Sequence, residues 1–232
     1  MTLSEFKQKN NIEFSDESLL TQAFIHRSFI NENPRTGLVH NERLEFLGDA
    51  VLELIVTEYL YSTYPHQNEG DLTAYRSALV NAVTLGALSS DLGFNDLMKL
   101  SKGEAKDVHR ARSSILADAY EAFVGALYLD QGYIACKTFI TTTLLTKTSE
   151  IIRRGLYKDA KSYIQEKSQE LYSLTPSYRV LSEEGPDHDK LFLIGIYFGE
   201  EKIDEGTGKS KQEGETAAAR NALVAKGWVS PQ

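Results

Sequence analysis

The chain has 232 residues, 41% of them hydrophobic and 25% charged, with a formal net charge of −8 and a pI near 5.2. This length can hold one large domain or two modest ones, each with its own core. The longest apolar run, residues 122–129, is too short to span a bilayer, and the amino terminus lacks the pattern of a signal peptide, so we expect a cytoplasmic protein.

Helical spacing of apolar residues dominates the first two thirds of the chain. The second expected helix has Ser15 or Asp16 as its N-cap. A loop over residues 31–38 follows, and then a long helix that stops at Pro65. No strand pattern interrupts this part, which is therefore expected to be all-α. The expected helices span residues 3–9, 16–26, 40–64, 69–88, 113–129 and 134–152.

The pattern changes after Arg153, where a short linker is expected. An amphipathic helix is followed by three strands and a final helix, which together make a small α+β domain of order α-β-β-β-α. The helices are expected at 159–174 and 210–226, and the strands at 176–181, 191–198 and 200–205. The predicted boundaries are residues 1–152 for the first domain, 153–157 for the linker and 158–232 for the second domain.

Three carboxylates lie inside the long helix of the first domain. Glu42, Glu45 and Asp49 are spaced i, i+3 and i+7, so they share one stripe of the helix. Like charges on one stripe repel, and acids beside a core lose hydration, so a plain core helix disfavours this arrangement. A bound cation would relieve both effects. The expected buried positions around the stripe are Leu44, Leu47, Val51, Leu54 and Ile55.

A second acidic pair, Asp118 and Glu121, has the same i, i+3 spacing on a later helix. If the two helices pack face to face, several carboxylates converge without any histidine or cysteine. Oxygen-only ligation suits hard ions such as Mg²⁺ or Mn²⁺, and Mg²⁺ shares its shell with substrate phosphates. The expected chemistry is therefore at phosphorus.

Two plainer interpretations remain open at this point. A single i, i+3 acidic pair usually forms a solvated helix face, although two such clusters bounded by apolar runs make that less favoured. A di-iron or di-manganese carboxylate bundle needs Glu-x-x-His on two helices. Neither Glu45 nor Glu121 has a histidine three residues on. Cys136, the only cysteine, excludes an internal disulfide and is expected to pack rather than to react.

Four segments resemble the ribonuclease III family. Residues 41–52, with the sequence NERLEFLGDAVL, resemble the family signature, and residues 114–122, SILADAYEA, resemble its second catalytic helix. Residues 23–28 and 69–72 resemble the preceding helix end and the next acidic turn. The order and spacing of the four segments also fit, so the resemblance covers nearly the whole chain.

The resemblance implies metal-assisted hydrolysis of double-stranded RNA. It makes Glu45, Asp118 and Glu121 the metal ligands for Mg²⁺, with Mn²⁺ as an alternative ion. It makes Asp49 and Glu121 the catalytic acids. Their implied role is to fix the ion so that it polarises the scissile phosphate and activates water.

Assembly and products also follow from the resemblance. Related enzymes work as homodimers in which each carboxylate cluster cuts one strand, leaving 5′-phosphates and short 3′ overhangs. Glu42 and Glu69 are then supporting acids, contributed from the outer part of the site or from the partner subunit. Processing of ribosomal RNA precursors and other structured RNAs is the implied role.

The second domain resembles a double-stranded RNA-binding domain in residues 161–166, 185–188 and 206–211. Such domains recognise A-form shape through successive minor grooves and the phosphates between them. Taken alone, the polar helix and loop residues of these segments would be ordinary solvated positions. The resemblance assigns Gln165 and Glu166 to the first minor groove, His188 to the second, and Lys209, Ser210 and Lys211 to the phosphates.

The last helix departs from this family pattern. Members carry two or three consecutive basic residues after the serine, whereas here Lys211 is followed by Gln212 and Glu213. From Leu156 onward, 10 Lys and Arg oppose 13 Asp and Glu, a net charge of −3. The predicted consequence is weak binding of RNA by this domain alone.

Two other classes of function compete with the nuclease. A non-catalytic double-stranded RNA-binding protein on the same fold would be expected to have lost one of the acids, and all of them are present. A helical interaction protein with an acidic stripe would have solvent-exposed carboxylates that are indifferent to Mg²⁺.

Overall fold

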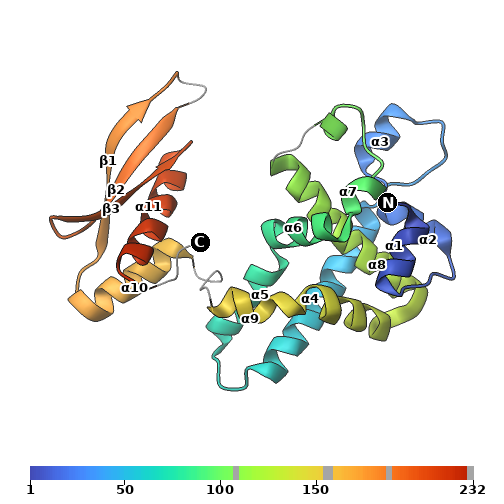
Figure 1. Cartoon of the computed structure of the whole chain (residues 1–232), viewed down its shortest axis with the longest axis horizontal. Helices are drawn as coiled ribbons and strands as arrows, with labels where there is room; N and C mark the ends of the chain where they lie inside the picture. The colour runs from blue at the N-terminus through green and yellow to red at the C-terminus, as the bar shows by residue number, and fades with distance from the viewer. Residues whose placement is uncertain (107–109, 154–158, 187–189, 229–232) are drawn as a thin grey trace. The chain divides into compact units, whose positions relative to one another are not determined.

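The computed structural model describes residues 1–106, 110–153, 159–186 and 190–228, which form two compact units divided between Ile151 and Ile152 (Figure 1). The first unit is helical. Its α-helices are α1 (Leu3–Asn10), α2 (Glu17–Ala23), α3 (Arg27–Glu32), α4 (Glu42–Thr63), α5 (Glu69–Val80), α6 (Ala82–Leu92), α7 (Phe94–Leu97), α8 (Arg110–Thr143) and α9 (Thr148–Arg153), with the 3₁₀ turns η1 (Glu104–Lys106) and η2 (Leu145–Lys147).

Local polar groups decide where these helices begin. The Asp16 side chain accepts a hydrogen bond of 2.9 Å from the Ser18 amide, which identifies Asp16 rather than Ser15 as the N-cap of α2. That helix ends at Ala23, three residues earlier than expected. The predicted loop at 31–38 starts late, because α3 extends to Glu32.

The expectation of one helix over residues 69–88 is wrong. Asn81 is extended, with φ −74° and ψ 157°, and separates α5 from α6. Its side chain accepts a 2.9 Å hydrogen bond from the Thr84 amide, so Asn81 is the N-cap of α6. The two helices predicted at 113–129 and 134–152 meet at Gly132, whose φ of 77° kinks α8.

An aromatic cluster holds α8 against the amino-terminal helices. Phe24 lies 4.9 Å from Phe94 between ring centroids, Phe6 lies 5.3 Å from Phe123, and Phe123 lies 4.9 Å from Phe139. All but Phe139 are at most 1% exposed. The edge-to-face geometry and the burial fix α8 at the centre of the unit.

The second unit has the expected α-β-β-β-α order. It contains α10 (Ala160–Tyr172), β1 (Pro176–Glu184), β2 (Leu191–Phe198), β3 (Glu201–Gly208) and α11 (Lys211–Ala225). The strands form an antiparallel sheet of order β1-β2-β3, and α10 and α11 pack against one of its faces (Figure 1). The core between helices and sheet includes Ile164, Ile196, Phe198, Ala218 and Leu223.

Exposure on α4 differs from expectation at Leu54 and at Leu47, which is half-buried. Leu44, Val51 and Ile55 are buried as predicted, but Leu54 is 58% exposed. Phe46 is exposed by 82% in this chain by itself. No helix among the described residues combines the length and the apolar character needed to cross a membrane.

Candidate active site

Helices α4 and α8 approach each other backbone to backbone. A Cβ added to Gly48 would lie 1.7 Å from the carbonyl oxygen of Glu121, and one added to Gly125 would lie 2.1 Å from that of Leu44. Both positions therefore require glycine, because any side chain would overlap the opposite helix. The close crossing brings Glu45, which lies one turn before Gly48, to the acidic pair on α8.

Three carboxylates meet at this crossing. Glu45, Asp118 and Glu121 each offer one oxygen, and these oxygens all lie within 4.8 Å of one another. The three residues are half-buried. Face-to-face packing of the two acidic helices was the condition for this convergence, and the structure has it.

Burial and mutual repulsion change how these acids ionise. Burial is the main cause that raises the pKa of Glu121 to about 8, and the charges of Asp49, Asp118 and Glu45 raise it further. Burial likewise raises the pKa of Glu45 to about 7, with the Asp118 charge as the next cause. The pKa of Asp118 is also raised by burial, against an opposing effect of His26. Burial and like charges thus both disfavour the ionised form of the cluster.

The donor set fits a hard divalent cation. Ligand oxygens around Mg²⁺ at 2.0–2.1 Å are about 3–4 Å apart, so oxygens within 4.8 Å can share one ion after small side-chain rotations. All three donors are carboxylate oxygens, which suit Mg²⁺ or Mn²⁺ rather than softer metals. A cation there would also remove the repulsion that raises the pKa values.

Asp49 lies beside this group without belonging to it. It is exposed on α4, one turn after Glu45. Its charge nevertheless raises the pKa of both Glu45 and Glu121, so it contributes to the same electrostatic site. Asp49 is therefore a solvent-facing acid at the edge of the three half-buried ones.

Glu42 is instead held by Arg27, and His40 lies on its other side. Its carboxylate lies 3.1 Å from Arg27 Nη1 and 3.7 Å from His40 Nδ1. The preceding residue, Asn41, is 2% exposed and donates its side-chain amide to the carbonyl of Ala23 at 3.0 Å. These contacts tie the start of α4 to the segment before α3.

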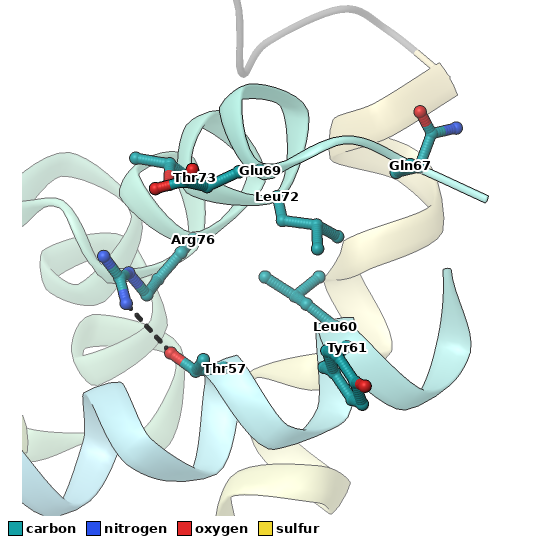
Figure 2. A pocket seen from close by; sticks show the side chains of 8 residues that line it. All are labelled: Thr57, Leu60, Tyr61, Gln67, Glu69, Leu72, Thr73 and Arg76. Carbon is teal, nitrogen blue, oxygen red and sulfur yellow. Dashed lines mark hydrogen bonds between the residues drawn. The ribbon is translucent and has the colours of Figure 1, made fainter. Parts of the chain in front are cut away.

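Glu69 lies away from the three carboxylates. It begins α5 and lines a cleft of about 490 Å³, where Leu60 and Leu72 face each other and Arg76 Nη1 donates to Thr57 Oγ1 at 3.0 Å (Figure 2). Thr57 is twelve residues after Glu45 on α4, roughly 18 Å along the helix at 1.5 Å per residue. The structure therefore does not bring Glu69 to the carboxylate group within one chain.

His26 is a neighbour of the site to which the sequence pattern assigned no role. It caps α3, with Nδ1 2.8 Å from Ser28 Oγ, and its amide donates to the carbonyl of Lys99 at 3.1 Å. Burial lowers its pKa, and the charges of Glu104 and Asp118 oppose that effect. A histidine directly before a helix is a possible N-cap, and this signal could have predicted that His26 lies at the start of α3.

The predicted RNA-contacting residues lie on two helices of the second unit. Gln165 and Glu166 are exposed on α10, and Lys209 and Lys211 are exposed around the start of α11. Ser210 is the N-cap of α11, and its side chain accepts a 3.2 Å hydrogen bond from the Glu213 amide. His188 lies outside the described residues.

Comparisons with known proteins match both units. Residues 16–148 match the family model described as ribonuclease-III-like, and residues 160–224 match the double-stranded RNA binding motif. Ribonuclease 3 of Borreliella afzelii is 43% identical over 96% of this chain and 91% of its own length. Ribonuclease 3 of Anoxybacillus flavithermus is 44% identical over 95% of this chain and 92% of its own length.

A solved structure agrees with these matches. The nuclease domain of ribonuclease III from Campylobacter jejuni superposes with a TM-score of 0.56 at 37% identity, covering 62% of this chain and 96% of that one. A helical unit with a carboxylate cluster, joined to a unit that recognises double-stranded RNA, defines an endoribonuclease of duplex RNA. The chain belongs to the ribonuclease III family.

Proposed function

We propose that this chain hydrolyses phosphodiester bonds of double-stranded RNA with Mg²⁺, leaving 5′-phosphates and short 3′ overhangs. The observation that carries the proposal is the convergence of Glu45, Asp118 and Glu121 on one point. Their half-burial and raised pKa values also argue against the alternative of a helical interaction protein, whose acidic stripe would be solvent-exposed.

The proposal gives the three clustered acids one role and Asp49 another. Glu45, Asp118 and Glu121 hold the cation, which when bound supplies positive charge to the scissile phosphate. Asp49, exposed at the edge of the group, orients the attacking water and accepts its proton in this proposal. Water forms a bond to phosphorus while the bond to the 3′ oxygen breaks, so the products are a 5′-phosphate and a 3′-hydroxyl.

We also propose that the first unit works as a homodimer. Phe46, Leu54 and Tyr61 are 82%, 58% and 75% exposed and lie at i, i+8 and i+15, on one stripe of α4. In a twofold dimer the partner subunit would cover this stripe, and the same contact would occur a second time about the axis. The solved Campylobacter nuclease domain is described as having a region involved in dimer formation. A partner would then supply supporting acids such as Glu69, which the single chain keeps away from its own cluster.

Substrate and location follow from the same proposal. Precursors of ribosomal RNA and other structured RNAs contain the long duplexes that two clusters in a dimer would cut, one strand each. Processing of such transcripts places the enzyme in the cytoplasm. Accumulation of uncut precursors on depletion of the protein is the expected result, and normal precursor levels would contradict this part.

The direct test is incubation of the full chain with a long RNA duplex. Cleavage is expected with Mg²⁺, and none with EDTA or with single-stranded RNA of the same sequence. Glu121→Gln should lose cleavage, whereas Glu13→Gln, the same change on an exposed loop, should keep it. Products should carry 5′-phosphates that a phosphatase removes. Equal cleavage with and without a divalent cation would refute the proposal.

A further inference from the structure

Glu183, the second-last residue of β1, lies between two lysines of the second unit. Glu183 has one carboxylate oxygen 3.6 Å from Lys211 Nζ and the other 3.8 Å from Lys190 Nζ. Its side chain is 39% exposed, and that of Lys211 is 60% exposed. Lys211 is one of the residues that the resemblance to double-stranded RNA-binding domains assigns to the RNA phosphates. In the free protein, however, this lysine lies beside an acid.

Strand register explains the pairing. Glu183 is the partner of Phe192 on β2, and Phe192 is the partner of Gly208 on β3. These three residues therefore lie side by side across the sheet at about 4.8 Å per strand. The chain then turns into α11, and Lys211 returns over the Phe192 ring, with Nζ 5.8 Å from its centroid. That path brings Lys211 back to the strand that carries Glu183.

The start of α11 packs directly against this end of the sheet. A Cβ on Gly208 would lie 2.3 Å from the amide nitrogen of Gly214, and one on Gly214 would lie 2.5 Å from a side-chain carbon of Ile194. Helix and strands are thus in direct contact at the first turn. Both side chains of the pair can rotate, but the packed backbones that carry them keep Glu183 close to any phosphate that this helix end binds.

The charges of Glu183 and RNA then compete. A phosphate that binds Lys211 must either displace the Glu183 carboxylate from the lysine or bind beside it and be repelled by its charge. Displacement also leaves Glu183 with one lysine, Lys190, in place of two, so counterion is taken up at this carboxylate while another counterion leaves the RNA. Both effects lower the affinity, and the second also lowers its dependence on salt.

We propose that Glu183 is an affinity-determining residue of the RNA-binding unit, an internal competitor that holds Lys211 back from phosphate. The proposal rests on the proposed function, because it needs α11 to face duplex RNA. An exposed ion pair of this kind changes an equilibrium by about two- to fivefold. Glu183→Gln should therefore tighten duplex binding by about that factor and steepen the logarithmic salt slope by up to about one unit.

The chain offers a matched control in Glu200. This residue makes an ion pair with Arg179 at 3.1 Å and precedes β3, at the opposite end of the strand from Gly208. The seven residues between the two strand ends span roughly 20 Å. Glu200→Gln makes the same change in net charge but leaves the pair between Glu183 and Lys211 intact. Comparing the two variants therefore distinguishes an effect of this pair from an effect of the overall charge.

The experiment titrates a short RNA duplex with the full chain in EDTA at several salt concentrations. The proteins are the wild type, Glu183→Gln, Glu200→Gln, Lys211→Ala and the double variant Glu183→Gln with Lys211→Ala. The gain from Glu183→Gln should shrink when Lys211 is absent, and in cleavage with Mg²⁺ the variant should lower KM more than it changes kcat. Circular dichroism checks that each variant is folded.

Three outcomes would overturn the inference. They are an equal effect of Glu183→Gln and Glu200→Gln, a gain that does not depend on Lys211, and weaker binding by Glu183→Gln, which would mean that the acid positions the lysine. A wild type that neither binds nor cuts duplex RNA would instead refute the proposed function. A wild type that does both, with unchanged variants, would refute only the role of Glu183.

Discussion

A Cβ added to Gly48 would lie 1.7 Å from the carbonyl oxygen of Glu121. The absence of a side chain at one residue of α4 is therefore what allows a metal-ligand candidate of α8 to stand beside Glu45. In the proposed function the acidic residues carry out the chemistry, and Gly48 permits the short distance between the helices that carry them.

Gly48→Ala should separate α4 from α8 or prevent their packing. Because the contact is with backbone rather than with a flexible side chain, we expect a loss of at least about 3 kcal/mol in the free energy of unfolding, measured by denaturant titration, and loss of cleavage. Gly103→Ala is the control, since its nearest neighbour atom would be 3.9 Å away. Equal stability of the two variants would contradict the close crossing.

Asp49→Asn and Glu121→Gln should each lower cleavage by at least about 100-fold, because they remove acids from the site. Duplex binding should remain nearly unchanged, since the proposed RNA contacts include the separate second unit. Ca²⁺, with its larger radius and looser geometry, should support binding and little cutting. Ordinary turnover by either purified variant would remove that acid from the mechanism.

Metal-free protein should become less stable as the pH rises from about 5 to about 8. Glu45 and Glu121 have folded pKa values of about 7 and 8 against an ordinary 4.5, so the folded state holds more protons than the unfolded state in this window. Thermal unfolding in EDTA at a series of pH values measures the effect. Glu121→Gln should flatten the dependence, whereas the control Glu13→Gln should leave it unchanged.

Mg²⁺ should reverse that loss of stability. The carboxylates must be ionised to bind the ion, so the rise in Tm caused by Mg²⁺ should be larger at pH 8 than at pH 6. The same ionisation predicts that cleavage rises with pH through this window. An equal Tm shift at both pH values would mean that Mg²⁺ binds elsewhere.

Phe46→Asp should convert a dimer to monomers and lower activity. The side chain is 82% exposed in one chain, so the change should hardly alter the fold, but a twofold interface would meet the new charge twice. Light scattering at micromolar concentration gives the mass. Val83→Asp is the control, because Val83 is 76% exposed on α6, away from the α4 stripe. Full activity of a monomeric wild type would exclude the dimer proposal.

Gln212→Arg should tighten duplex binding and steepen the logarithmic salt slope by roughly one unit, if the new cation reaches a phosphate. The sequence also suggests Glu213→Lys, but the structure gives Glu213 a capping role, because its carboxylate accepts a 3.0 Å hydrogen bond from the Lys209 amide. Adding Glu213→Lys should therefore lower stability by about 1 kcal/mol. Titrations at several salt concentrations and thermal unfolding separate the two effects.

Much of the candidate site could be predicted from sequence, because the spacing of its acids along each helix is a local pattern. Helical spacing placed Glu42, Glu45 and Asp49 on one stripe, and Asp118 with Glu121 on another. The change from helical spacing to short β-rich runs after Arg153 indicated the second unit. The break at Asn81 was missed because asparagine is tolerated inside a helix as well as at its start, and only the contact with Thr84 decides between the two.

The sequence by itself determined which residue types carry the chemistry, since carboxylates at helical spacing and a signature motif depend only on order along the chain. Tertiary structure decided which of them meet. Glu69 matches the family motif as well as Glu45 does, yet it begins α5 and lines a separate cleft. No sequence pattern predicted a role for Glu183. Its pairing with Lys211 depends on the register across three strands, and a local pattern does not determine that register.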